Sequence, residues 1–334
     1  MKKKVVSTIK YSLLLAIGVG LLWLAFRGVN LSETIEEIKH ANVFWLSMSI
    51  LASLIAFFSR AIRWNLLIEP LGFQPKIMNT SAALMIGYLA NLAVPRLGEV
   101  TRCGTLNQTE KVPFDKLLGT VIFERIIDVL CLLVCIILVA VSEYDRLGNF
   151  MNENIFEPLK SKAHLFINSP ILIASVVLIF FLLVLFLLKN KTGKGIVPKV
   201  INIMKGIADG MTSVRKMKKP IQFIFHTILI WVMYFFMTYL CFFSLPATSQ
   251  LDWHAGLFVL VVGGMGMSAP VQGGIGAYHL LVSHGLILYG LSLGHGLAFA
   301  TLMHTSQTLV VIVFGALSFL YLFLKQKNGT TDAS

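Results

Sequence analysis

An arginine–glutamate–arginine series directly follows a proline in the stretch NLAVPRLGEVTR, residues 91–102. Arg96, Glu99 and Arg102 are spaced three residues apart, so on a helix they share one surface. Pro95 ends the apolar run before them, because proline lacks the amide hydrogen and clashes with the preceding helical turn. Asn91 could either bond the backbone at this break or line a cavity beside it, and the sequence leaves both open.

A second charged stretch, FERIID at residues 123–128, places Glu124 and Asp128 on one helical face with Arg125 beside them. An isolated charge in lipid costs about 3 kcal/mol or far more, so we expect these groups to pair with the first series. The arginines at 96, 102 and 125 and the carboxylates at 99, 124 and 128 then sum to zero. An anion would bind there only with displacement or protonation of a carboxylate, for which Glu99 is the first candidate. The alternative is an ionic clamp that only holds the structure together.

Glycines follow a second proline in PVQGGIGAYH, residues 270–279. After Pro270, the glycines Gly273, Gly274 and Gly276 would let a phosphate approach the backbone at a helix start. His279 is a candidate for a proton-linked role. The stretch lacks the Lys-Ser/Thr pair of a nucleotide loop, and the histidines lack metal-ligand spacing, so we predict neither a cofactor nor a metal.

The chain that carries these residues is 56% hydrophobic and 13% charged over 334 residues, whereas soluble domains carry about 25% charged residues. The sequence therefore predicts an all-α polytopic membrane protein with a single transmembrane domain over residues 1–334. Six segments are long enough to cross a hydrocarbon core of about 30 Å. They are residues 8–26, 42–66, 117–141, 168–188, 221–244 and 297–324.

Basic residues set the expected orientation, since positive loops stay in the cytoplasm. They cluster in residues 189–220, which we interpret as a cytoplasmic amphipathic helix on the inner leaflet, or else a solvated basic helix. Both termini are then cytoplasmic, and the plasma membrane is the expected location. The net charge of +12 is explained by this pattern, so no nucleic acid partner is expected. Arg60 and Arg63, near the inner end of the second span, are interpreted as anchors that snorkel toward the interface.

The same charge pattern requires segments 78–116 and 256–293 each to begin and end on one side of the membrane. We interpret both as re-entrant helical hairpins with their tips at the two prolines. Six spans and two hairpins form a 4+4 inverted-topology repeat, with repeat 1 at about 1–141 and repeat 2 at about 168–324. Such repeats are typical of secondary transporters, which hold substrate between broken helices near the midplane.

Three stretches resemble the membrane family typified by the flippase half of bacterial lysylphosphatidylglycerol synthase, the multiple peptide resistance factor. They are N-x-x-x-P-R-L-G-E-V-x-R from Asn91, E-R-x-x-D from Glu124, and P-x-x-G-G-I-G from Pro270. The resemblance implies a flippase-like fold that moves a lipid between leaflets. The aminoacyl-transferase domain of the fused synthase is absent from this sequence, so lysyl transfer is not expected.

The expected function is translocation of an anionic lipid, either a phospholipid or a polyprenyl-phosphate carrier, through a cavity between the two hairpins. One alternative is a membrane-embedded enzyme or enzyme subunit that acts on a lipid-linked substrate and uses Glu99, Glu124 or His279 as acid or base. Another is a non-transporting scaffold that recruits a cytoplasmic partner through residues 189–220.

Overall fold

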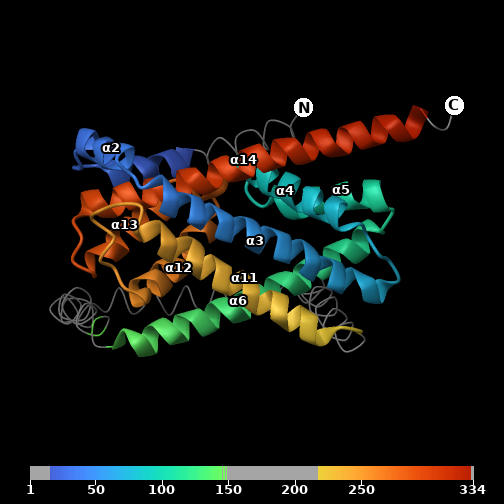
Figure 1. The fold of residues 1–334 in the computed structure, drawn as a ribbon, viewed down its shortest axis with the longest axis horizontal. Helices are drawn as coiled ribbons and strands as arrows, with labels where there is room; N and C mark the ends of the chain where they lie inside the picture. Colours follow the sequence, from blue (N-terminus) through green and yellow to red (C-terminus); the bar gives the residue numbers. More distant parts are fainter. Residues whose placement is uncertain (1–15, 145, 147, 149–216, 332–334) are drawn as a thin grey trace, which may run out of the picture.

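The structure is a computed structural model that describes residues 16–144, 146, 148 and 217–331, and all regular elements in these ranges are helical (Figure 1). A helix over Ala16–Phe26 comes first. The remaining elements, in chain order, are α2 (Leu31–Lys39), α3 (Val43–Ile68), η1 (Glu69–Leu71), α4 (Ile77–Ala93), α5 (Leu97–Glu110), α6 (Phe114–Ser142), α11 (Pro220–Phe242), α12 (Trp253–Ser268), η3 (Gln272–Gly274), α13 (Ala277–Ile287) and α14 (Leu293–Thr331).

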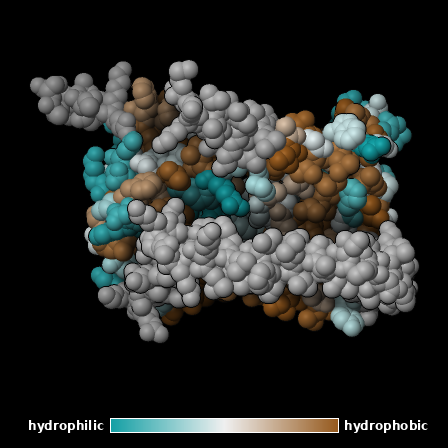
Figure 2. Space-filling model, turned by 180° about the vertical axis from the view of Figure 1, so that it is seen from behind, coloured by the Kyte–Doolittle hydropathy of each residue, from teal (hydrophilic) through white to brown (hydrophobic). Residues whose placement is uncertain are grey.

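Four helices are long and apolar enough to cross a membrane: α3 with η1, α6, α11 and α14. They correspond to four of the six predicted spans, which confirms a helical membrane protein. Many of their large apolar side chains face outward, and hydrophobic residues gather over part of the face shown in Figure 2. The predicted span 168–188 and nearly all of the basic segment 189–220 lie outside the described residues.

Both predicted helix breaks are present. Helix α4 has 17 residues and ends at Ala93, and α5 begins at Leu97 and packs back along it. Helices α12 and α13 form the second hairpin around Pro270, with η3 at its tip. At 1.5 Å per residue, α4 and α12 reach about 24–26 Å, which is short of a full crossing. That both arms of each hairpin return to one membrane face stays a prediction.

Two glycines allow the arms of the first hairpin to pack backbone against backbone. A Cβ atom on Gly98 would overlap the carbonyl oxygen of Gly87 and lie 2.6 Å from Asn91 Nδ2. The amide of Gly98 donates a hydrogen bond of 2.6 Å to Asn91 Oδ1. Asn91 therefore bonds the backbone across the break and closes the tip, which decides between the two roles that the sequence left open.

We expect Gly98→Ala to destabilise the protein, by about 1–3 kcal/mol, because the added methyl group must push the two arms apart. Gly104→Ala on the same helix is the matched control, since nothing lies within 4 Å of its Cβ position. Its higher helix propensity should make that variant as stable as the parent or slightly more stable. Thermal unfolding in detergent compares the two, and equal melting temperatures would contradict this account of the hairpin.

The tips of the two hairpins meet inside the molecule. A Cβ atom on Gly273 would lie 2.9 Å from Leu92 Cδ2, so η3 packs directly on the last turn of α4. Helix α14 runs along both hairpins, next to α13 at one end and α4 at the other (Figure 1). His304 of α14 forms a 2.7 Å hydrogen bond between Nε2 and the carbonyl oxygen of Gly273. The long helix thereby fixes the second tip against the first.

Candidate functional site

Glu124 of α6 is the centre of a buried group of charges and is 0% exposed. Arg60 and Arg63 reach it from α3, and Arg102 reaches it from α5. Arg60 Nη2 donates a very short hydrogen bond to Glu124 Oε1, Arg63 Nη2 lies 3.6 Å from the same oxygen, and Arg102 Nη1 lies 3.3 Å from Oε2. Arginines from two helices therefore converge on one carboxylate.

Asp128, one turn further along α6, extends these contacts toward the outside of the helix bundle. Its Oδ1 accepts a 2.7 Å bond from Arg63 Nη2, and its Oδ2 accepts a 3.1 Å bond from Arg60 Nη2. Arg125 Nη1 lies 3.7 Å from Asp128 Oδ2, and Arg125 Nη2 lies 3.1 Å from Glu99 Oε1. We call the seven connected residues the charge cluster: Arg60, Arg63, Glu99, Arg102, Glu124, Arg125 and Asp128.

The interpretation of Arg60 and Arg63 as snorkelling anchors is wrong. They are only 5% and 0% exposed, and they turn inward to the carboxylates of α6. Arg60 and Arg63 are three residues apart on α3, and Glu124 and Asp128 are four residues apart on α6. Both spacings put the two side chains on one helix face, so each arginine can reach both acids. This complementary spacing on two apolar helices was the signal in the sequence that would have identified them.

The charge cluster is not neutral, unlike the six-residue set expected from the sequence. Four arginines stand against three carboxylates, which leaves one net positive charge. Arg96 is not part of it: this residue is exposed and comes directly before α5, where its backbone is left-handed with φ 61°. Among the residues that the structure describes, no carboxylate lies at ion-pair distance from Arg96.

Several buried donors of the charge cluster have no hydrogen-bond partner among the described residues. They are Nε and Nη1 of Arg63, Nη2 of Arg102, Nε of Arg60 and Nε of Arg125. Leaving a buried donor without a partner costs about 1–3 kcal/mol, and more for a charged group. Unused guanidinium donors with a net positive charge are suited to a ligand with several anionic oxygens, such as a phosphate.

Aromatic groups hold the arginine side chains in place around these contacts. Arg102 lies over the Trp64 ring, 4.8 Å from its centroid, and Arg60 lies 6.0 Å from the Tyr88 ring. Arg60 Nη1 also donates a 2.9 Å hydrogen bond to the hydroxyl group of Tyr234 on α11. Cation–π and hydroxyl contacts stabilise the charge without neutralising it, so the net charge of the cluster remains.

An apolar groove leads to the outer edge of the charge cluster. It has a volume of about 390 Å³ and lies along α5 and α6, with Glu99 and Arg125 as its charged residues. Its other walls are apolar: Leu118, Val121, Ile122, Ile126, Val129 and Leu130. The Arg125 side chain is 41% exposed, whereas Arg102 is 2% exposed. The groove therefore offers a surface for a hydrocarbon chain beside Glu99 and Arg125, which connect, pair by pair, to the buried arginines.

The second hairpin contributes its predicted residues to packing rather than to the charge cluster. A Cβ atom on Gly276 would overlap the carbonyl oxygen of Gly18 in the first helix, and one on Gly274 would lie 3.2 Å from Met267 Cα. His279 is buried, with its ring centroid 4.9 Å from that of His304. Among the described residues, no hydrogen bond or ion pair joins Pro270, His279 or these glycines to the cluster.

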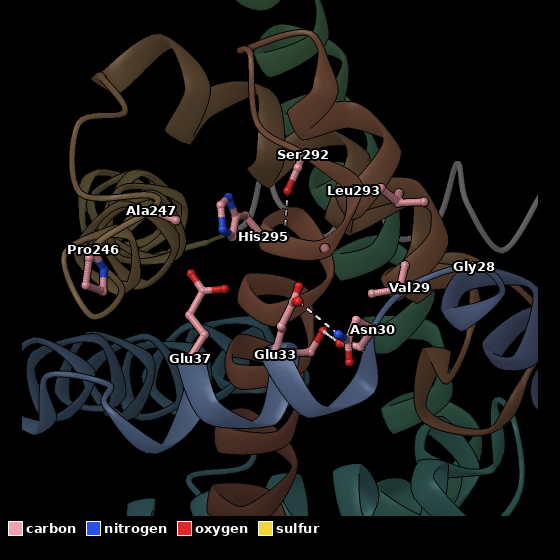
Figure 3. Close-up of a pocket in the computed structure, with 12 residues that line it drawn as sticks. Gly28, Val29, Asn30, Glu33, Glu37, Pro246, Ala247, Ser292, Leu293 and His295 are labelled. Carbon is pink, nitrogen blue, oxygen red and sulfur yellow. Dashed lines mark hydrogen bonds between the residues drawn. The ribbon is translucent and has the colours of Figure 1, made fainter.

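A larger cavity than this groove lies elsewhere, at the α2 end of the molecule, and sequence reasoning missed it. It has a volume of about 870 Å³ between α2, the loop before α12 and the start of α14. Glu33 and Glu37 project into it from α2, and His295 faces them from α14 (Figure 3). Burial raises the pKa of Glu37, while the nearby His295 lowers it. With two carboxylates and no arginine in its lining, this cavity is electrostatically unsuited to an anion.

Comparison with known proteins identifies a family for this chain. The model of the family described as the lysylphosphatidylglycerol synthase TM region matches residues 11–315, which include both hairpins and the whole charge cluster. No curated protein matches the chain, and no solved structure does. The family match confirms the resemblance found in the motifs and indicates a role connected with membrane lipids. This chain therefore belongs to the family of lysylphosphatidylglycerol synthase transmembrane regions.

Proposed function

We propose that this protein binds an anionic membrane lipid by its phosphate at the charge cluster and moves it between the leaflets. The observation that carries the proposal is the buried net positive charge with unused arginine donors at the end of an apolar groove. A phosphate that crosses the hydrocarbon core must exchange its water for other hydrogen-bond donors, or pay a large desolvation cost. The arginines supply such donors.

The arrangement suggests a path for the lipid. Its acyl chain lies in the groove between α5 and α6, where the walls are apolar. Its phosphate first meets Arg125, the most exposed arginine of the cluster, and competes with Glu99 for it. Displacement of that carboxylate opens the way toward Asp128 and the buried arginines behind it.

The proposal includes a transporter-like architecture in the plasma membrane with both termini in the cytoplasm. Two broken helices whose tips pack on each other, Leu92 against Gly273, are the internal feature that supports it. Non-helical backbone at membrane depth is tolerated where it is buried in protein or lines a wet cavity. Two re-entrant hairpins within a 4+4 inverted repeat would meet this condition near the midplane.

Cysteine labelling tests this topology. In a background without the four native cysteines, single cysteines replace the exposed residues Gln74, Gln108, Gln250 and Ser292. We expect cysteines at 74 and 108, which flank the first hairpin, to react with a membrane-impermeant maleimide only from the cytoplasm. Those at 250 and 292 should react only from outside. A flanking pair that splits across the membrane would rule out that re-entrant hairpin.

Translocation is tested by reconstituting the protein in liposomes that contain a fluorescent anionic phospholipid, with the outer leaflet quenched chemically. We expect Arg125→Gln to slow lipid movement by about tenfold or more, because a charge-assisted contact contributes about 1.5–3 kcal/mol. Arg27→Gln is the control, since Arg27 lies over Trp23 and outside the cluster. Equal rates in protein-free and protein-containing liposomes would refute translocation, and a new lipid product in the same liposomes would favour an enzyme.

A further inference from the structure

The charge of the cluster indicates which anionic lipid fits it. We infer that the site accepts a lipid phosphodiester with one negative charge in preference to a lipid phosphate monoester, and that binding takes up no proton. The inference rests on the proposed function and narrows its substrate, since sequence reasoning left both a phospholipid and a polyprenyl-phosphate carrier open.

Each carboxylate of the cluster lies at ion-pair distance from an arginine. Glu99 lies 3.1 Å from Arg125, and Glu124 lies 3.3 Å from Arg102. Asp128 accepts a 2.7 Å bond from Arg63. Four guanidinium groups paired with three carboxylates leave one positive charge without a counter-charge. A ligand with one negative charge therefore makes the occupied site neutral.

A phosphate monoester does not balance the cluster in this way. Its charge at pH 7 is about −1.5 to −2, because its second pKa is about 6. It would leave close to one negative charge in a site where Arg63 is 0% and Arg102 is 2% exposed. A buried charge without a partner is costly, so a monoester would bind weakly or would need an additional proton.

Among the described residues, the other titratable side chains beside the cluster belong to tyrosine, histidine and cysteine, and none of them is a carboxylate or an amine. Tyr88 of α4 faces Arg60 with its ring, and Tyr234 of α11 accepts a hydrogen bond from Arg60 through its hydroxyl group. His226 of α11 lies nearby, with its Nδ1 2.8 Å from Ser59 Oγ. Measurements at pH 8 keep an imidazole in its neutral form.

The number of unused donors suits the two charged oxygens of a diester. A diester phosphate has two non-bridging oxygens that share the negative charge. Arg63 offers Nε and Nη1, and Arg102 offers Nη2, on side chains whose other nitrogens already contact Glu124. Two arginines on either side of one carboxylate can thus bind two oxygens of a second anion.

Changing the charge at the edge of the cluster should change the preference. Glu99→Gln raises the net charge of the cluster to about two. Glu99 has the most exposed side chain of the three carboxylates, at 27%, so its replacement should disturb folding least. We expect this variant to bind the monoester at least as well as the diester. Gln108→Ala is the control, an exposed position on the same helix outside the cluster.

The experiment is calorimetric titration of the full chain in neutral detergent at pH 8. Short-chain phosphatidylglycerol is the diester probe, phosphatidic acid the monoester and phosphatidylcholine the zwitterion. We expect phosphatidylglycerol to bind about tenfold more tightly than either of the others, which corresponds to about 1.4 kcal/mol. The observed enthalpy should be the same in two buffers of different ionisation enthalpy, after correction for buffer dilution, because no proton is taken up.

The outcomes separate this inference from the proposed function. If none of the anionic lipids binds, the proposed function itself fails. If both anions bind but phosphatidic acid binds as tightly as phosphatidylglycerol, or if the enthalpy depends on the buffer, the inference fails and the anion site stands. An unchanged preference in Glu99→Gln would also overturn it, since the charge of the cluster would then not set the selectivity.

Discussion

Replacing Glu124 with alanine is expected to cause the largest loss of stability of any single change in the charge cluster. The substitution leaves Arg60, Arg63 and Arg102 close together and buried, with Asp128 as the remaining acid near them. Removing one partner of a buried ion pair costs about 3–5 kcal/mol. The total stability of a folded protein is about 5–15 kcal/mol, so we expect much of the variant to aggregate or unfold on extraction.

Thermal unfolding and size-exclusion chromatography in detergent measure this loss. Glu36→Gln is the matched control, because Glu36 pairs with Lys39 at 58% side-chain exposure and such surface pairs contribute about 0–1 kcal/mol. The double variant Glu124→Ala, Arg102→Met should recover part of the stability, since it removes one of the stranded charges. A Glu124→Ala protein with the melting temperature of the parent would show that the cluster does not hold α3, α5 and α6 together.

The helix breaks were predictable because proline acts locally. Pro95 and Pro270 end the apolar runs before them regardless of what packs around them, and the structure has both breaks where the sequence placed them. The pairing of Glu99 with Arg125 was predictable for a related reason, since neither charge is stable alone in lipid.

The inward orientation of Arg60 and Arg63 depends on tertiary packing and was missed. An arginine near the end of a span can extend to the interface or turn into the bundle, and its own sequence neighbours are compatible with both. The choice is made by α6, whose acids lie 64 and 65 residues further along the chain. The cavity of Glu33, Glu37 and His295 was missed for the same reason, because α2 and α14 meet there only in the fold.

The contrast between Arg102 and Arg96 decides whether the anion site is the charge cluster or the hairpin tip. Arg102→Met removes the net positive charge but keeps an apolar stem beside Trp64, and Glu124 retains Arg60 and Arg63. We therefore expect a folded protein whose transport of anionic phospholipid is slower by about tenfold or more. Arg96→Asn removes the exposed cation at the tip with a residue that tolerates a left-handed backbone.

We expect Arg96→Asn to keep most of the transport rate, because Arg96 lies outside the network of ion pairs that reaches the buried donors. Both variants are compared with the parent in the same liposomes, at equal amounts of monodisperse protein. If Arg96→Asn abolishes transport while Arg102→Met preserves it, the phosphate binds at the start of α5, where the tip presents its positive helix end. The charge cluster would then be a clamp that holds α3, α5 and α6 in place, and its single excess charge would play no part in selecting the lipid.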